Sequence, residues 1–106
     1  MITFKESPIF TKLVDKYLTD EEYFALQWDL LSNPSAGILI PGSGGLRKIR
    51  WKTREGGKRG GYRIIYYWRD MQGEIWLLTI YAKNEVDNIP AHILRQIKEE
   101  FENDST

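Results

Sequence analysis

The sequence predicts an α+β domain: an antiparallel sheet with an N-terminal helical hairpin and a C-terminal helix. Two segments near the N-terminus space their apolar residues as helices do. Three later segments are rich in Tyr, Ile and Trp and are joined by short connections, as in a strand meander. We expect one domain over residues 1–106, because this length is close to the commonest domain size and no repeat or linker interrupts it.

The N-terminal part predicts a short strand followed by two helices. Residues 2–5 alternate apolar and polar side chains, as a strand does. Ser7 is suited to cap a helix and Pro8 to occupy its first position. Thr19 and Glu22 have the spacing of a capping box, which predicts the start of a second helix. The two helices are joined tightly, so we expect an antiparallel hairpin.

The second half predicts three strands and a helix. The strands are expected over 46–52, 62–69 and 74–83, where β-branched and aromatic residues are frequent. Pro90 begins a final helix whose apolar residues share one face: Ile93, Leu94, Ile97 and Phe101. We expect all helices to pack on one face of the sheet.

The charge of the chain is strongly segregated, although lysines and arginines equal aspartates and glutamates at 15 each. The window 46–69 holds nine basic residues and one acid, whereas the rest holds six basic residues and fourteen acids. Such a block attracts polyanions even in a neutral protein. A solvated, charged hairpin is the plainer interpretation.

Strand side chains alternate between the two faces of a sheet, so the basic block is expected to have a cationic face. Depending on register, this face collects Lys48, Arg50, Arg63, Tyr81 and Lys83. The opposite face is expected to be buried beneath the helices through Ile49, Ile64, Tyr66, Leu78 and Ile80. A slip of one residue would reverse the two faces.

A cationic face with aromatic rings suits RNA, because Lys and Arg neutralise phosphates and rings stack on unpaired bases. We assign RNA or ribosome binding to further residues of the block: Arg47, Lys52, Arg54, Lys58, Arg59 and Tyr67. Any single ring is more simply read as an ordinary core or sheet-surface residue.

Several other chemistries lack the residues they need. There are no cysteines, which excludes disulfides and thiolate zinc sites and fits a reducing cytoplasm. The single histidine, His92, is expected on the surface of the last helix. No carboxylate cluster lies near the basic block, so we expect neither a metal nor another cofactor. No apolar segment is long enough to predict a membrane span.

RNA can be cleaved without a metal when the ribose 2′-hydroxyl attacks its own 3′-phosphate. The reaction needs a base, stabilisation of the phosphorane charge and an acid for the leaving 5′-oxygen. Arginine stays protonated, so a lysine crowded by cations or Tyr81 is the better proton carrier. The candidate catalytic residues are therefore Lys48, Arg50, Arg63, Tyr81 and Lys83.

Three segments, in this order and spacing, resemble the RelE/HigB toxin family, nearest its HigB group: GGLRKIR at 44–50, GKRGGYRIIYY at 57–67 and LLTIYAKNE at 77–85. The resemblance runs over nearly the whole chain. It implies a RelE-like fold and the toxin of a type II toxin–antitoxin pair, which cleaves translated mRNA in the ribosomal A site. The implied partners are a cognate antitoxin encoded alongside, the ribosome and mRNA.

The resemblance also implies roles for particular residues. Lys48 and Arg50 match the basic pair of the first meander strand, Arg63 the phosphate-binding arginine, and Lys83 the basic motif that ends the last strand. Two departures concern the leaving-group acid. Asn84 stands where RelE has an arginine, and no tyrosine follows Tyr81. Tyr81, Lys83 and Lys58 remain candidates for that acid.

Two other functions remain open on the sequence alone. One is inhibition of DNA gyrase, as performed by ParE-type toxins of the same superfamily. The other is non-catalytic binding of RNA or the ribosome. The basic residues shared with RelE favour the nuclease.

Overall fold

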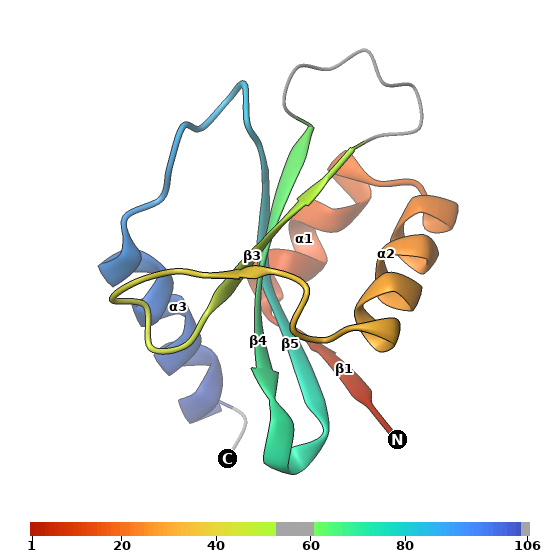
Figure 1. The fold of residues 1–106 in the computed structure, drawn as a ribbon. Helices are drawn as coiled ribbons and strands as arrows, with labels where there is room; N and C mark the ends of the chain where they lie inside the picture. Colours follow the sequence, from red (N-terminus) through yellow and green to blue (C-terminus); the bar gives the residue numbers. More distant parts are fainter. Residues whose placement is uncertain (53–60, 105–106) are drawn as a thin grey trace.

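The computed structural model describes residues 1–52 and 61–104, which form three helices around a five-stranded sheet (Figure 1). The strand order is β1-β5-β4-β3-β2; β1 pairs with β5 in parallel, and the other pairs are antiparallel. In chain order the elements are β1 (Thr3–Glu6), α1 (Pro8–Tyr17), α2 (Asp20–Ser32), β2 (Ile38–Leu39), β3 (Arg47–Trp51), β4 (Tyr62–Arg69), the 3₁₀ turn η1 (Asp70–Gln72), β5 (Glu74–Ala82) and α3 (Ala91–Asp104). The predicted α+β class, the helical hairpin and the C-terminal helix are confirmed.

The helices cover both faces of the sheet, so the expectation that they share one face is wrong. The hairpin of α1 and α2 lies on one side and α3 lies on the other (Figure 1). Each side has its own buried cluster, one beneath the hairpin and a second beneath α3. An apolar helix face predicts burial, but it does not say against which side of a sheet the burial occurs.

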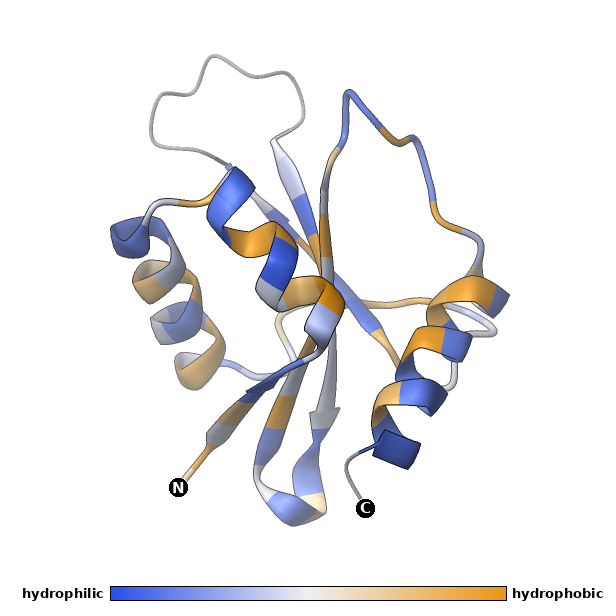
Figure 2. Cartoon of the chain, turned by 180° about the vertical axis from the view of Figure 1, so that it is seen from behind, coloured by the Kyte–Doolittle hydropathy of each residue, from blue (hydrophilic) through white to orange (hydrophobic). Residues whose placement is uncertain are grey.

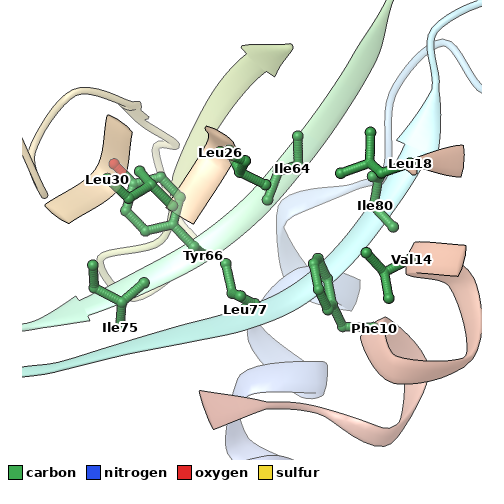
Figure 3. Packing of buried hydrophobic residues seen from close by; sticks show 10 residues of the cluster. All are labelled: Phe10, Val14, Leu18, Leu26, Leu30, Ile64, Tyr66, Ile75, Leu77 and Ile80. Carbon is green, nitrogen blue, oxygen red and sulfur yellow. The ribbon is translucent and has the colours of Figure 1, made fainter. Parts of the chain in front are cut away.

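The hairpin-side core is built from the first two helices and the residues of β4 and β5 that face them (Figure 3). Tyr66 is fully buried there, and its hydroxyl accepts from the Gly37 amide at 2.8 Å and donates to the Pro34 carbonyl at 2.7 Å. The phenol oxygen therefore has a hydrogen-bond partner both as acceptor and as donor, as burial of a polar atom requires. The cluster comprises Phe10, Val14, Leu18, Leu26, Leu30, Ile64, Tyr66, Ile75, Leu77 and Ile80.

Both predicted helix caps are confirmed. The Ser7 hydroxyl accepts from the Phe10 amide at 3.0 Å at the start of α1. In α2, the Glu22 amide donates to the Thr19 hydroxyl at 3.1 Å, and the Thr19 amide donates to the Glu22 carboxylate at 2.8 Å. Each cap satisfies backbone donors that the first turn of a helix leaves unpaired.

A β-bulge in β5 changes which residues face α3. Ile65 pairs with Thr79, but the next residue, Tyr66, pairs with Leu77, so Leu78 is an extra residue on β5. Leu78 therefore belongs to the cluster beneath α3, and its predicted burial beside Ile80 on the hairpin side is wrong. Strict alternation along the strand could not reveal this, because a bulge reverses the faces of every residue beyond it.

The second core joins α3 to the other sheet face. It consists of Leu46, Ile65, Trp76, Leu78, Tyr81 and Leu94. Hydrophobic and hydrophilic positions alternate along α3, which is the pattern of a helix with one packed face (Figure 2). Within residues 1–52 and 61–104, no helix has the length and apolarity needed to cross a membrane.

Candidate functional site

Three candidate catalytic residues form one row across three neighbouring strands. Arg50 of β3 lies opposite Arg63 of β4, which lies opposite Tyr81 of β5. The row is on the α3 side of the sheet, since Tyr81 and Ile65 belong to that core. Lys48 pairs with Ile65 in the next row. The register that the sequence analysis assumed for these residues is therefore confirmed.

Arg63 is the centre of this row, and only 8% of it is exposed. Its guanidinium makes a long hydrogen bond of 3.4 Å to the Tyr62 carbonyl. A guanidinium keeps its proton at all relevant pH values, so the row carries a fixed, largely desolvated positive charge. Arg50, which is exposed, adds a like charge directly across the strand pair. Such pairs repel, and an anion placed between them would relieve the repulsion.

Tyr81 closes the row on β5 and is almost completely covered, with 5% exposed. Burial raises the pKa of its phenol above the ordinary value, while the nearby Arg63 charge acts in the opposite direction. The phenol therefore stays protonated at neutral pH. It can donate a hydrogen bond or a proton, but it is unsuited to act as a base.

Two lysines border the row where the β5–α3 loop passes. The Lys83 ammonium lies 3.1 Å from the Asp87 carboxylate and 3.3 Å from the Asp87 carbonyl oxygen. The Lys48 ammonium lies 3.5 Å from the side-chain oxygen of the next residue, Asn88. One loop thus holds both lysines, a contact that the sequence analysis missed. The exposed Asp87–Lys83 pair is weak, so it leaves Lys83 available to another anion.

Lys48 also lines a groove of about 540 Å³ beside the row. The groove lies between β2 and the start of α3, and most of its lining is apolar. It is formed by Ile38, Leu39, Ile40, Pro41, Lys48, Asn88, Ile89, Pro90 and Ala91. A nucleic acid bound to the row would have this apolar surface at its side.

The structure does not bring two of the predicted binding residues to this face. Arg47 points to the hairpin side, where its guanidinium donates to the Ser35 carbonyl at 3.1 Å and the Gly37 carbonyl at 2.7 Å. Arg47 lies in the basic window of the sequence, but the alternation of a strand turns it away from Lys48 and Arg50. Lys52 lies beyond the end of β3 and lines a hollow beside Trp51 and the first turns of α2. Both residues therefore lie apart from the row.

Tyr67 is on the α3 face, where it is partly buried and packs against neighbouring side chains. The Lys98 ammonium lies 4.3 Å above its ring, and Trp76 packs edge-on with ring centroids 5.6 Å apart. It fits the plainer interpretation of a sheet-surface aromatic that supports a helix. The remaining predicted binding residues, Arg54, Lys58 and Arg59, lie outside the described residues.

His92 is exposed on α3, as the sequence analysis expected. In the part of the chain that the structure describes, no three His, Cys, Asp or Glu side chains gather in a way that could hold a metal ion. The site that remains is a row of two arginines and one neutral phenol, flanked by two lysines. Such a site can bind a phosphate and move a proton.

Comparison with known proteins extends this description of the fold. No protein-family model matches the sequence. A mutant of the Escherichia coli toxin RelE, in the free state, is similar in structure with a TM-score of 0.62; it is 15% identical, and the match covers 92% of this chain and 96% of that chain. A conserved hypothetical protein from Helicobacter pylori aligns with a TM-score of 0.46, at 15% identity over 80% of this chain and 98% of that chain. The chain therefore has the fold of a RelE-like toxin.

Proposed function

We propose that the protein is the toxin of a type II toxin–antitoxin pair and cleaves translated mRNA on the ribosome. The observation that carries this proposal is the row of Arg50, Arg63 and Tyr81, with Lys48 and Lys83 at its border. The RelE-like fold supports the proposal, as does the resemblance of three sequence segments to the RelE/HigB family, nearest its HigB group. The protein would then act in the cytoplasm on ribosome-bound mRNA.

The two arginines of the row suit the scissile phosphate. Arg50 and Arg63 face each other across the strands, and a phosphate between them would accept hydrogen bonds from both guanidinium groups. As the 2′-hydroxyl attacks, negative charge grows on the phosphorane oxygens. Fixed cations stabilise that charge without reorganising, which is the usual origin of a large rate enhancement. The need for a 2′-hydroxyl restricts the reaction to RNA.

Proton transfer is assigned to the border of the row. Lys48 or Lys83 takes the proton from the 2′-hydroxyl or supplies one to the leaving 5′-oxygen. Tyr81 lies beside Arg63 on β5. It stays protonated, so it can donate a hydrogen bond but cannot accept a proton. No step in this scheme is assigned to a metal ion.

Translation in vitro followed by mapping of mRNA ends tests the proposal. We expect cuts within the coding region that require ribosomes and disappear when Arg63 is replaced. A gyrase-dependent DNA break would instead identify a ParE-type inhibitor. Arrest of translation with intact mRNA would identify a non-catalytic binder. Either result would overturn the proposal.

A further inference from the structure

The outward face of α2 carries a row of large apolar side chains that the fold leaves uncovered. Phe24 is 67% exposed, Trp28 is 62% exposed and Leu31 is 37% exposed. Their spacing of four and three residues places them on one side of the helix, one turn after another. The rings of Phe24 and Trp28 stack with centroids 6.4 Å apart and planes 18° apart. We call these three residues the α2 ridge.

The α2 ridge does not contribute to the core of this domain. The same helix already buries Leu26 and Leu30 completely on its other side, against the sheet. Single exposed apolar residues are ordinary, but neighbouring large ones indicate a surface that another molecule covers. Aromatic residues at spacings of three, four and seven are also the usual anchors by which one helix binds a partner.

The charge around the ridge restricts what that partner can be. The α2 helix contains Asp20, Glu21, Glu22 and Asp29 and no lysine or arginine. Asp20 precedes Phe24 by one turn, so its carboxylate borders the ridge. This field repels RNA and anionic membranes. A second copy docking ridge to ridge would bring like charges together, which is unfavourable. The complementary partner is an apolar segment flanked by lysine or arginine.

We propose that the α2 ridge is a docking site for the antitoxin, which presents an amphipathic segment with basic flanks. This inference rests on the proposed function only in that it needs an antitoxin. The ridge is on the hairpin side of the sheet, whereas Arg50, Arg63 and Tyr81 are on the α3 side. Contact with the ridge and cleavage of RNA therefore depend on different residues, and they can be altered separately.

The test uses the purified full chain and, as the probe, the purified protein encoded by the neighbouring gene. The double variant Phe24→Ala/Trp28→Ala removes the stacked rings without touching the core. The control is Met71→Ala, which removes another apolar side chain, 91% exposed, at the opposite end of the sheet from the loop that holds the lysines. Thermal unfolding by circular dichroism verifies that both variants fold.

Titration of the probe should show binding weakened about thirtyfold or more in the double variant, the scale at which buried aromatic anchors act. The control should bind within about threefold of the wild type, the scale of an uninvolved surface residue. Asp20→Asn should reduce affinity at low salt and have little effect at high salt, because exposed charges are screened. The double variant should still cleave mRNA but require more of the probe for inhibition.

Three outcomes would overturn the inference, and a fourth would overturn only the nuclease assignment. Unchanged binding of the double variant would show that the antitoxin docks elsewhere, while the toxin assignment stands. Concentration-dependent dimerisation that the double variant loses would show that the ridge pairs with a second copy. A neighbouring protein that neither binds nor inhibits would remove the premise of an antitoxin. If that protein binds the ridge but mRNA is not cleaved, the docking site stands and the nuclease assignment fails.

Discussion

The Ser7 hydroxyl donates a 2.7 Å hydrogen bond to the carbonyl oxygen of Leu78, the residue that the bulge adds to β5. The same hydroxyl accepts from the Phe10 amide and so caps α1. The Ser7 amide donates to the Leu77 carbonyl at 2.9 Å. One buried serine thus fixes the start of the hairpin and the irregular point of the central sheet. The bulge separates Tyr81 from the N-terminal half of β5.

Replacing Ser7 with alanine should lower the free energy of unfolding by about 2 kcal/mol, from loss of a helix cap and an unpaired buried carbonyl. Ser32→Ala is the matched control, since that exposed hydroxyl only donates to the Trp28 carbonyl within its own helix. Urea denaturation of both variants measures the difference. Equal losses in the two variants would show that the link to Leu78 contributes nothing.

The Tyr23 phenol, which donates to the Glu6 carboxylate, should make the protein sensitive to alkaline pH. Burial, together with that carboxylate, raises the pKa of Tyr23 far above its ordinary value. The folded state therefore favours the protonated phenol. Its stabilisation is complete below pH about 10, where the unfolded tyrosine titrates, and declines as the pH rises further.

Tyr23→Phe should therefore lose less stability than the wild type when the pH rises from about 9 to about 11, which spans one pH unit on either side of the pKa of a free phenol. Urea denaturation at each pH measures the free energy of unfolding. The difference between the two proteins isolates Tyr23 from the other tyrosines. Parallel curves over this window would contradict the assignment. The quantity compared is the change in the free energy of unfolding with pH, so the comparison holds even if the variant is already less stable at pH 7.

Arg63→Ala should reduce single-turnover mRNA cleavage about a hundredfold or more, as removal of a transition-state charge contact does. Arg47→Ala is the control, because Arg47 is a basic strand residue of the same sheet that points to the hairpin side. It should retain cleavage within about threefold, the scale of a residue that contributes no transition-state contact. If a folded Arg63→Ala protein cleaves at the wild-type rate, the row is not the active site.

Lysine-to-arginine substitutions at Lys48 and Lys83 separate proton transfer from charge. Arginine keeps the positive charge but does not readily release its proton. A lysine that only holds phosphate should tolerate the change with a modest loss. One that carries a proton should lose about a hundredfold or more. Cleavage on programmed ribosomes is followed across pH, and two unaltered profiles would exclude both lysines as proton carriers.

The chemical step should need no divalent metal of the protein's own. Ribosomes require magnesium, so activity alone cannot separate the two requirements. Elemental analysis of purified, active protein should show no stoichiometric metal. Zinc, manganese or iron bound at one atom per chain in active protein would contradict the proposed mechanism.

The sequence by itself determined the two helix caps and the order of the elements apart from the short β2 and η1, because these depend on neighbours three or four residues away. With an assumed register, it also predicted that Arg50, Arg63 and Tyr81 share a face, and the structure has that register. These three lie on the same side of the bulge, so simple alternation holds among them. Basic residues are concentrated in one window, and any antiparallel meander would bring some of them together.

Only the tertiary structure decided which residues of β4 and β5 pair beyond the bulge. It also decided which face of the sheet each helix covers. Leu78 reverses the alternation of β5, and nothing in the local pattern marks the extra residue. The loop contacts of Lys48 and Lys83 with Asn88 and Asp87 also appear only in the folded chain. Bulges, helix sides and loop contacts are set by packing between distant segments, whose energies a local pattern does not contain.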